Sequence, residues 1–477
     1  MSDPQHTPHL VRRLSLTAAM MIVAGSMIGS GIFRKPATMA GQLLSPELLL
    51  LVWIVAGIIT FIGALTNAEI AGMFDSTGGQ FIYFKHMYGD FAGYLYGWSI
   101  LAVIQTGSQA AIAYAFAEYV GYFFRYPETS AFLREITFSI PLVGPLHPFD
   151  AISTKLVAIS CILFLTGINY IGVFFGGVVQ TIITFIKIAS ILLLSAFIFI
   201  FGHGSMANAY HGFVIADSVR RNLLPLFGLA ISGAFWAYDG WNNVTFVSGE
   251  IKNPQRNVPR ALLFGTLIVI AVYVVINLAF LYVLPIEEMK NSPLVAASAA
   301  EKIFGSGGAS IIALAVVIST FGALNGSILS TARVQFAMAE AKLFFKSLAK
   351  VHPRFETPHI SLLVQGFWSS VLVLSGSFDT ITDYVIFASW LFYMMGAIGV
   401  FVLRKKMPDT PRTYRVWGYP YTPALFVIFS FLFLANSIVS DTQNAMMGVV
   451  LIGLGIPFYV YWKYWGRAKS EASSAKQ

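Results

Sequence analysis

The sequence predicts an all-α membrane protein with twelve transmembrane helices, and three observations support this fold class. Of the 477 residues, 57% are hydrophobic and only 11% are charged, whereas a soluble domain has about 25% charged residues. The apolar residues gather in runs close to the roughly 20 residues that cross a bilayer. Two of these runs are interrupted by polar, glycine-rich stretches. Each run must form a helix, because lipid offers backbone groups no other hydrogen-bond partner.

The expected spans follow one another along most of the chain with short connections. In order they are residues 14–41, 47–73, 91–124, 154–172, 176–202, 223–250, 260–284, 308–340, 359–376, 380–403, 422–440 and 445–465. Most of the 30 lysines and arginines face the cytoplasm if the N-terminus does so, as the positive-inside rule requires. We therefore expect an integral protein of the cell membrane, with cytoplasmic tails at 1–13 and 466–477, no cleaved signal peptide and no attached soluble domain.

The most informative feature is the interruption of the first and sixth spans. The first contains Gly25, Gly29 and Gly31 among serines, and the sixth contains the polar stretch 233–243. The two interruptions are five spans apart. A duplicated unit of five helices has an odd number of crossings, so its second copy enters the membrane inverted. This predicts a first repeat at 14–202, an extracellular loop at 203–222, a second, inverted repeat at 223–403, and helices 11 and 12 at 404–465.

An unwound segment within a membrane helix has a chemical use. Glycine permits the backbone conformations that such a break requires. The break exposes N–H groups at the start of one half-helix, which suit a carboxylate, and C=O groups at the end of the other, which suit an ammonium. An α-amino acid carries both charges. The alternative is that these glycines only allow close helix packing, which we expect of Gly89, Gly93 and Gly97 in the third span.

Five stretches in chain order carry recognisable motifs. They are residues 29–33 (GSGIF), 67–83 (with NAEI and GGQFIY), 235–241 (FWAYDGW), 249–260 (GEIKNPQRNVPR) and 324–333 (LNGSILSTAR). Together they resemble the amino acid–polyamine–organocation (APC) superfamily of transporters. Within it the chain is most similar to the L-type amino acid transporters and the bacterial serine/threonine exchangers. The resemblance implies the LeuT-like fold, with its inverted five-helix repeats and broken helices 1 and 6.

The resemblance also implies which groups bind the substrate. Its carboxylate would be received by the amides of Gly29, Ser30 and Gly31, and its ammonium by the carbonyls of Met27, Trp236, Ala237 and Asp239. Trp236 stands where the family places an aromatic gate over the substrate, more often a phenylalanine. The alternative role for Trp236 is anchoring at the membrane interface, which its position deep in the span disfavours.

Lys187 lies midway along the fifth span. A lysine at the bilayer centre costs about 2.5–3.5 kcal/mol on insertion scales, so such a residue is by default functional or paired. In the family resembled, a lysine of this span replaces the sodium ion that other carriers of the fold use. The resemblance implies sodium-independent transport, with the ammonium bridging carbonyls near Gly25 and the hydroxyls of Ser327, Ser330 and Thr331. The alternative is a structural lysine with no part in the transport cycle.

Other ionisable residues also lie within the expected spans. Glu69 and Glu118 fall near span ends, where solvation or pairing with a loop is expected, and Arg333 is expected to lock the cytoplasmic side through ion pairs. Asp239 lies in the sixth-span break, so its carboxylate can face Lys187, solvent or a cationic substrate. Apart from Asp239, the presumed central pocket holds neutral side chains, to which the third span contributes Gln105, Thr106, Ser108 and Gln109. A dibasic substrate would require a second acid, so neutral L-amino acids are favoured.

Composition disfavours other partners and other classes of protein. The basic residues lie at helix ends rather than in a stripe with stacking aromatics, so nucleic-acid binding is not expected. The 8 histidines and the single Cys161 have no metal-ligand spacing, and we expect no metal and no cofactor. Eukaryotic relatives pair with a glycoprotein through a cysteine that follows span three. Residues 125–153 contain none, so no disulfide-linked heavy chain is expected.

The expected function is secondary transport of neutral L-amino acids by alternating access, independent of sodium and either exchanging or proton-coupled. A clustered nucleophile and base would indicate an enzyme, and a filter motif a channel; the sequence has neither. Two alternatives stay open. An amino acid–amine antiporter for cationic substrates shares the span-six tryptophan, and agmatine or cadaverine competition would identify it. A transporter-like nutrient sensor would have the same binding site but no flux in liposomes.

Overall fold

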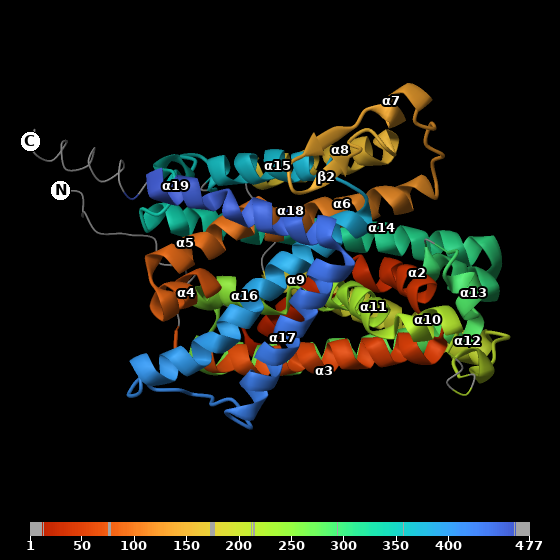
Figure 1. Ribbon diagram of the computed structural model, residues 1–477, viewed down its shortest axis with the longest axis horizontal. Coiled ribbons are helices and arrows are strands. Elements are labelled where there is room, and N and C mark those ends of the chain that lie inside the picture. The colour runs from red at the N-terminus through yellow and green to blue at the C-terminus, as the bar shows by residue number, and fades with distance from the viewer. Residues whose placement is uncertain are drawn as a thin grey trace, which may run out of the picture.

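The computed structural model describes residues 12, 14–74, 78–171, 177–210, 212, 215–292, 294–355, 357–461 and 463. These residues form a bundle of helices, most of which run along one long axis (Figure 1). Within this part of the chain, 10 helical stretches are long and apolar enough to cross a membrane. They correspond to all the expected spans except the sixth and the ninth. The protein is therefore an integral membrane protein.

The sixth and ninth expected spans are not long, continuous α-helices. Residues 223–250 divide into α11 (Leu223–Tyr238) and η3 (Trp241–Glu250), a 3₁₀ helix of 10 residues. Residues 359–376 form α15 (His359–Val373), which has 15 residues and is therefore about 22 Å long at 1.5 Å per residue. The prediction of twelve spans depends on whether these two segments also cross the bilayer.

The first half of the chain contains the other broken helix. The first expected span divides into α1 (Leu16–Met27) and α2 (Gly31–Leu43). The helices that follow are α3 (Pro46–Ala71), α4 (Gln80–Tyr88), α5 (Asp90–Ser99), the π-helix η1 (Ile100–Ile104), α6 (Gln105–Gly121), α7 (Ala131–Glu135), α8 (Ile152–Ile171) and α9 (Gly177–Phe201). After α7, the strands β1 (Phe138–Ile140) and β2 (Gly144–Leu146) form an antiparallel hairpin with Phe138 opposite Leu146.

The second half contains the remaining elements. They are η2 (Met206–Asn208), α10 (Asp217–Arg221), α11, η3, α12 (Pro254–Val283), α13 (Ile286–Met289), α14 (Val295–Glu340), η4 (Lys346–Ala349), α15, α16 (Phe378–Lys406), α17 (Tyr421–Ser440), α18 (Thr442–Gly453) and α19 (Gly455–Tyr461). At 46 residues α14 is longer than the expected span, because it also includes a helical segment before a kink at Gly305 (φ 66°).

The starts of three helices around the bundle centre follow from local sequence. Ser15 before α1, Ser45 before α3 and Ser377 before α16 each accept a hydrogen bond from a backbone N–H of the first turn. This side-chain cap satisfies an N–H group that has no partner within the helix. Pro46 suits the first position of α3, because the N–H group that proline lacks would be unpaired there. The caps fix where these helices begin.

Small residues allow α12 and α3 to pack closely behind the two breaks. A Cβ atom on Gly265 of α12 would lie 2.7 Å from the Cβ atom of Val23 in α1. A Cβ atom on Gly57 of α3 would lie 3.0 Å from the hydroxyl of Tyr238. The Trp53 ring lies edge-on to Tyr238 and Tyr273, with centroids 5.8 and 5.6 Å away. The rigid support that these contacts provide holds the ends of α1 and α11 in place.

Candidate functional site

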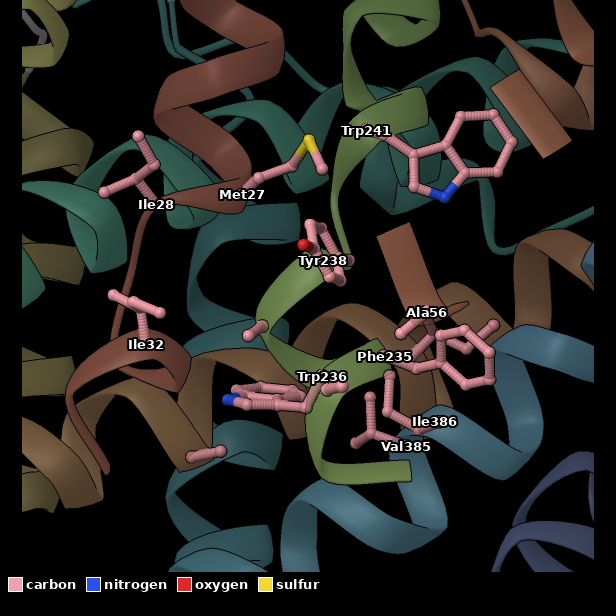
Figure 2. Close-up of a cluster of buried hydrophobic side chains, with 14 of the residues drawn as sticks. Met27, Ile28, Ile32, Ala56, Phe235, Trp236, Tyr238, Trp241, Val385 and Ile386 are labelled. Carbon is pink, nitrogen blue, oxygen red and sulfur yellow. The ribbon is translucent and has the colours of Figure 1, made fainter. Parts of the chain in front are cut away.

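The two interrupted helices lie side by side at their breaks. Figure 2 shows an extended segment between Met27 at the end of α1 and Ile32 in α2, next to the break between Tyr238 and Trp241. A Cβ atom on Gly31 would lie 2.6 Å from the Cα atom of Ala237, closer than real Cβ atoms approach. The helices are thus interrupted where the glycine-rich stretches predicted, and glycine at position 31 permits their contact.

Two further residues link the breaks. Gly240 has a φ of 91°, which glycine adopts without the cost that a side chain would add. A Cβ atom there would lie 3.0 Å from the carbonyl oxygen of Ser26. The hydroxyl of Tyr273 lies 2.8 Å from the carbonyl oxygen of Met27 and 3.0 Å from that of Ala237. The ends of α1 and α11 are therefore tied to one point on α12.

The start of α2 presents peptide N–H groups without acceptors. Among the hydrogen bonds between described residues, none is donated by the backbone of Gly29, Ser30 or Gly31. The Ser30 side chain is buried, and its hydroxyl has no hydrogen-bond partner in the same part of the chain. The N-terminus of a helix also carries a partial positive charge. These groups together suit an anion such as a carboxylate.

Three of the four carbonyls assigned to the ammonium, those of Met27, Trp236 and Ala237, already have hydrogen-bond donors. Those of Met27 and Ala237 share the single hydroxyl proton of Tyr273, and that of Trp236 accepts from the N–H of Asp239 at 3.2 Å. A carbonyl oxygen has two lone pairs, so each can accept a second bond. Their role toward an ammonium therefore stays a prediction.

A cavity of about 1130 Å³ lies against the breaks. The residues assigned to the substrate that line it are Met27, Gly29, Ser30, Gly31, Trp236 and Asp239, and Gly25, Ser327 and Ser330 line it too. Ala237, Lys187 and Thr331 are not among its lining residues. Ala237 is covered because it packs against Gly31. The structure thus brings most of the predicted site residues to one cavity.

The cavity reaches the protein surface at one end of the bundle. Its lining continues past Glu250 at the end of η3 to Glu340 at the end of α14 and to Val351 beyond it. Glu340 and Val351 are exposed. Arg333 also lines this part, and its guanidinium lies 3.3 Å from the Glu250 carboxylate. The ion pair expected of Arg333 is therefore present, at the mouth of the cavity.

Aromatic rings lie on the other side of the breaks. The indole of Trp236 lies edge-on to Phe378 at the start of α16, with ring centroids 6.0 Å apart. Trp236 and Phe235 point to opposite sides of α11 (Figure 2). Phe235 packs against Trp390, with centroids 3.8 Å apart, whereas Trp236 borders the cavity. A side chain that borders the cavity and packs on Phe378 suits a gate.

Ion pairs beside Phe378 form what we call the Asp379 cluster, made of Arg34, Lys35, Glu118, Asp379 and Asp383. Lys35 Nζ lies 2.7 Å from Asp379 and 3.8 Å from Asp383. Arg34 Nε lies 3.1 Å from Glu118. Lys35 is only 1% exposed, so its charge depends on these acids for compensation. The cluster joins α2, α6 and α16 on the side of the breaks away from the cavity mouth.

Lys187 of α9 reaches the break in the first span. Its ammonium donates a hydrogen bond of 3.2 Å to the carbonyl of Ile28, three residues beyond Gly25. The hydroxyls assigned to it bond elsewhere. Ser327 donates to Gln105 at 3.3 Å, while Ser330 and Thr331 donate to the Ser327 carbonyl at 3.2 and 2.8 Å. The link from span five to the first break is present, and the pairing of Lys187 with those hydroxyls stays a prediction.

Asp239 carries its carboxylate within the sixth-span break. One oxygen accepts a hydrogen bond of 2.6 Å from the hydroxyl of Tyr393 in α16. Among the described residues no cation lies within ion-pair distance of it. The carboxylate therefore forms no ion pair with Lys187 in the described part of the chain. It lines the cavity, where it adds negative charge next to the neutral groups.

Comparison with known proteins decides the family. A model of the amino acid permease family matches residues 14–456. The chain is 35% identical over 469 residues to the serine/threonine exchanger SteT of Bacillus subtilis, covering 97% of this chain and 98% of that protein. It is 30% identical to the mouse b(0,+)-type amino acid transporter 1, with 96% and 90% covered. It is 32% identical to the human large neutral amino acids transporter small subunit 2, with 96% and 81% covered.

The chain belongs to the amino acid permease family. The resemblance to the APC superfamily, found in the motifs, is confirmed over nearly the whole length of this permease. Its relatives are amino acid transporters rather than enzymes. The permease is thus a membrane protein of amino acid transport.

Several site residues of this permease were not predicted from the sequence. Tyr273 joins both breaks, and its one signal was a polar hydroxyl in the middle of an apolar run. Lys35 and Asp379 are separated by 344 positions, and no local pattern relates them. For Glu118 the prediction of solvation or loop pairing was wrong. It pairs with Arg34 of α2, so its partner lies on another helix rather than on a loop.

Proposed function

We propose that this permease carries neutral L-amino acids across the cell membrane by alternating access. The observation that carries the proposal is the contact between two helix breaks at the wall of a cavity. The cavity is open toward one end and is bordered on the other side by Trp236, which packs on Phe378. A site with this arrangement admits a solute from one side at a time. The names of its relatives, an exchanger and a transporter of large neutral amino acids, support the substrate class and exchange.

We propose for the site that the free amides of Gly29, Ser30 and Gly31 bind the carboxylate. The ammonium lies near the carbonyl ends of α1 and α11, at Met27, Trp236, Ala237 and Asp239. A zwitterion then bridges the two broken helices, with its negative end at the start of α2. Binding one substrate draws both breaks together. In this way substrate binding would shift the equilibrium between the conformations of the transporter.

For the architecture we propose twelve crossings in two inverted repeats at 14–202 and 223–403, followed by helices 11 and 12 at 404–465, with both termini cytoplasmic. The distribution of short elements supports it: α7, α10 and α13 lie at one end of the bundle in Figure 1, and α4 and α19 lie at the other. In the proposed topology the first three belong to extracellular loops. This arrangement requires that α11 together with η3 forms one crossing and that α15 forms another.

We propose that transport needs no sodium, because Lys187 supplies a positive charge at the break where other carriers of this fold place the ion. Its bond to the Ile28 carbonyl supports this assignment. We also propose that the protein works without a disulfide-linked partner. Its single cysteine, Cys161, is buried in α8, away from the segment that joins α6 to α8.

One observation favours a second candidate, an antiporter of cationic amino acids and amines. Asp239 lines the cavity without a cation among the described residues, and a cationic side chain would compensate its charge. The neutral class is preferred because Tyr393 already stabilises this carboxylate and because the groups around it are neutral. Competition by agmatine or cadaverine, stronger at acidic pH, would favour the antiporter.

The proposal is tested with purified protein in sodium-free liposomes. The liposomes are preloaded in turn with a panel of unlabelled amino acids, and uptake of labelled amino acid is followed. Neutral amino acids should stimulate uptake from the opposite side, in choline as in sodium. Trp236→Ala should abolish exchange, whereas Trp417→Ala, at a 79% exposed side chain, should not. Absence of flux with every amino acid, or dependence on sodium, would contradict the proposal.

A further inference from the structure

The peptide groups at the breaks bind what all α-amino acids share. They hold a carboxylate and an ammonium, so they do not distinguish one side chain from another. Selection among neutral amino acids has to come from other parts of the cavity wall. This step rests on the proposed function, and it concerns three polar side chains to which the family motifs assign no role in selection.

Three neutral side chains from three separate elements form one hydrogen-bonded chain in the cavity wall. The hydroxyl of Ser327 in α14 donates to the Gln105 side-chain oxygen at 3.3 Å. The Gln105 amide, in α6, donates to the side-chain oxygen of Asn243 in η3 at 3.1 Å. All three residues line the same cavity as Ser30 and Trp236. We call this set the Gln105 chain.

The hydrogen bonds within the Gln105 chain leave some of its donors and acceptors available to a ligand. In the structure Gln105 accepts from Ser327 and donates to Asn243, so both ends of its amide are already engaged within the wall. The Asn243 amide keeps its two N–H groups for other acceptors, and the Ser327 oxygen keeps lone pairs for other donors. The wall therefore offers donors at one end and an acceptor at the other. Gln105 is only 5% exposed, so bulk water does not easily replace a lost partner.

We propose that the Gln105 chain makes this permease select amino acids with a hydroxyl or carboxamide side chain over aliphatic ones of the same shape. A hydroxyl or carboxamide both donates and accepts, so it satisfies the free groups of the wall. An aliphatic side chain of equal size displaces water from them and returns no hydrogen bond, which leaves buried polar groups unpaired. Shape alone does not discriminate, because the cavity has about 1130 Å³.

The proposal is tested with pairs of amino acids that differ only by a polar group for an apolar one. Threonine and valine have the same shape, as do serine and 2-aminobutyrate. Each competes for exchange of a labelled neutral amino acid in sodium-free liposomes. One buried hydrogen bond of about 1.4 kcal/mol corresponds to a factor of ten. The half-maximal concentration of threonine should therefore be about tenfold below that of valine.

Two variants connect this preference to the Gln105 chain. Gln105→Leu should bring the threonine-to-valine ratio close to one, and Ser327→Ala should reduce it by several fold. The matched control is Gln109→Leu, one turn further along α6. Gln109 is buried too, but it bonds Thr331 and Ser369 and does not line the cavity. Gln109→Leu should at most lower stability and should keep the threonine-to-valine ratio. If Gln105 had a purely structural role, Gln105→Leu would keep this ratio as well.

The outcomes separate this inference from the proposed function. If the wild type exchanges neutral amino acids but threonine and valine compete equally, the selection proposal is wrong and the transport proposal stands. Should Gln105→Leu and Ser327→Ala keep the wild-type ratio, the preference belongs to other residues and the Gln105 chain is not its source. If no amino acid is exchanged at all, the proposed function fails and this inference with it.

Discussion

Lys187 holds the end of the first broken helix from the neighbouring α9. Lys187 is 6% exposed, and its ammonium donates to the Ile28 carbonyl at 3.2 Å. A hydrogen bond to a charged donor is worth about 1.5–3 kcal/mol. That energy acts where α1 has stopped and α2 has not begun, so it fixes the positions of the carbonyls and amides that the substrate is proposed to meet.

Lys187→Met should therefore lower exchange at least tenfold in sodium-free liposomes, while the protein still folds. Methionine removes a charge that the bilayer penalises, so poor insertion would not explain the loss. Lys302→Met is the matched control, because Lys302 pairs with Glu288 at a side chain that is 48% exposed. The assignment of Lys187 fails if its variant exchanges at the wild-type rate.

Single residues differ in how far the sequence could predict them. Lys187 was identifiable because a lysine amid apolar residues of a membrane span is costly, which indicates a functional or paired residue. Its partner was expected near Gly25 and is Ile28, since the exact turn at which α1 ends depends on packing against α12. The role of Tyr273 was not predictable, because a tyrosine in an apolar run can also lie at the membrane interface.

At the scale of elements, the contact between the breaks depends on Gly31. Gly31→Ala places a Cβ atom 2.6 Å from the backbone of Ala237, so α2 and α11 have to move apart. We expect the KM for exchange to rise about tenfold, because the amides and carbonyls then no longer match one zwitterion. Gly167→Ala in α8 is the control, since a Cβ atom there meets nothing within 4 Å.

Initial exchange rates over a range of substrate concentrations measure this effect, and thermal melting in detergent follows the fold. An unchanged KM in Gly31→Ala would mean that the close contact is not part of the binding site. A lower melting temperature without a change in KM would assign Gly31 to packing alone, which is the alternative that the sequence left open.

The Asp379 cluster couples α2 to α16 on the side of the breaks away from the cavity mouth. In Asp379→Asn the ammonium of Lys35 loses the negative charge at 2.7 Å and keeps only that of Asp383 at 3.8 Å. Because removal of one member of a buried pair leaves an uncompensated charge, this end should open more often. Asp217→Asn is the control, since Asp217 pairs with Arg220 on the surface.

Labelling of a single cysteine measures the opening. In a Cys161→Ser background, Ser232→Cys introduces a thiol beside Asp383, to which Ser232 donates at 3.3 Å. A membrane-impermeant maleimide should label it several times faster when Asp379→Asn is also present. Equal labelling rates would show that the cluster does not hold this end closed.

The elements themselves were largely predictable, because lipid leaves a helix as the only solution for an apolar run. The sequence also located both breaks through their glycines. It did not predict the 3₁₀ geometry of η3 or the extra helical segment before Gly305 in α14. The link between Lys35 and Asp379 was not predictable either, because it joins positions 344 residues apart.

At the scale of the whole molecule, the cavity and the Asp379 cluster describe one state of the proposed transport cycle. The cavity is open past Glu250 and Arg333, and the Asp379 cluster lies beyond Trp236 and Phe378 on the other side of the breaks. An alternating cycle requires a second state, in which the cavity is closed at Glu250 and Arg333 and open on the side of the Asp379 cluster. The parts that have to rearrange are α1 with α2 and α11 with η3, because their breaks form the boundary between the two sides.

Glu69 of α3 connects the end of α16 and the segment before α17 to the rest of the bundle. Its carboxylate is 1% exposed and lies 2.7 Å from the Arg404 guanidinium and 3.3 Å from that of Arg412. It also accepts the N–H of Val416 at 2.7 Å. These partners belong to the end of α16 and the segment that leads to α17. Glu69 was expected to be solvated or paired with a loop. Its pairing with Arg412 and Val416 agrees with the second possibility.

Glu69→Gln should lower the thermal stability of the protein without altering its substrate affinity. Removing one partner of a buried ion pair costs about 3–5 kcal/mol, so the melting temperature in detergent should fall by several degrees. The KM should not change, since Glu69 does not line the cavity. Glu287→Gln removes a pair whose acid is 65% exposed and should cost less than about 1 kcal/mol. Equal melting temperatures of Glu69→Gln and the wild type would mean that α17 is held by apolar packing rather than by this carboxylate.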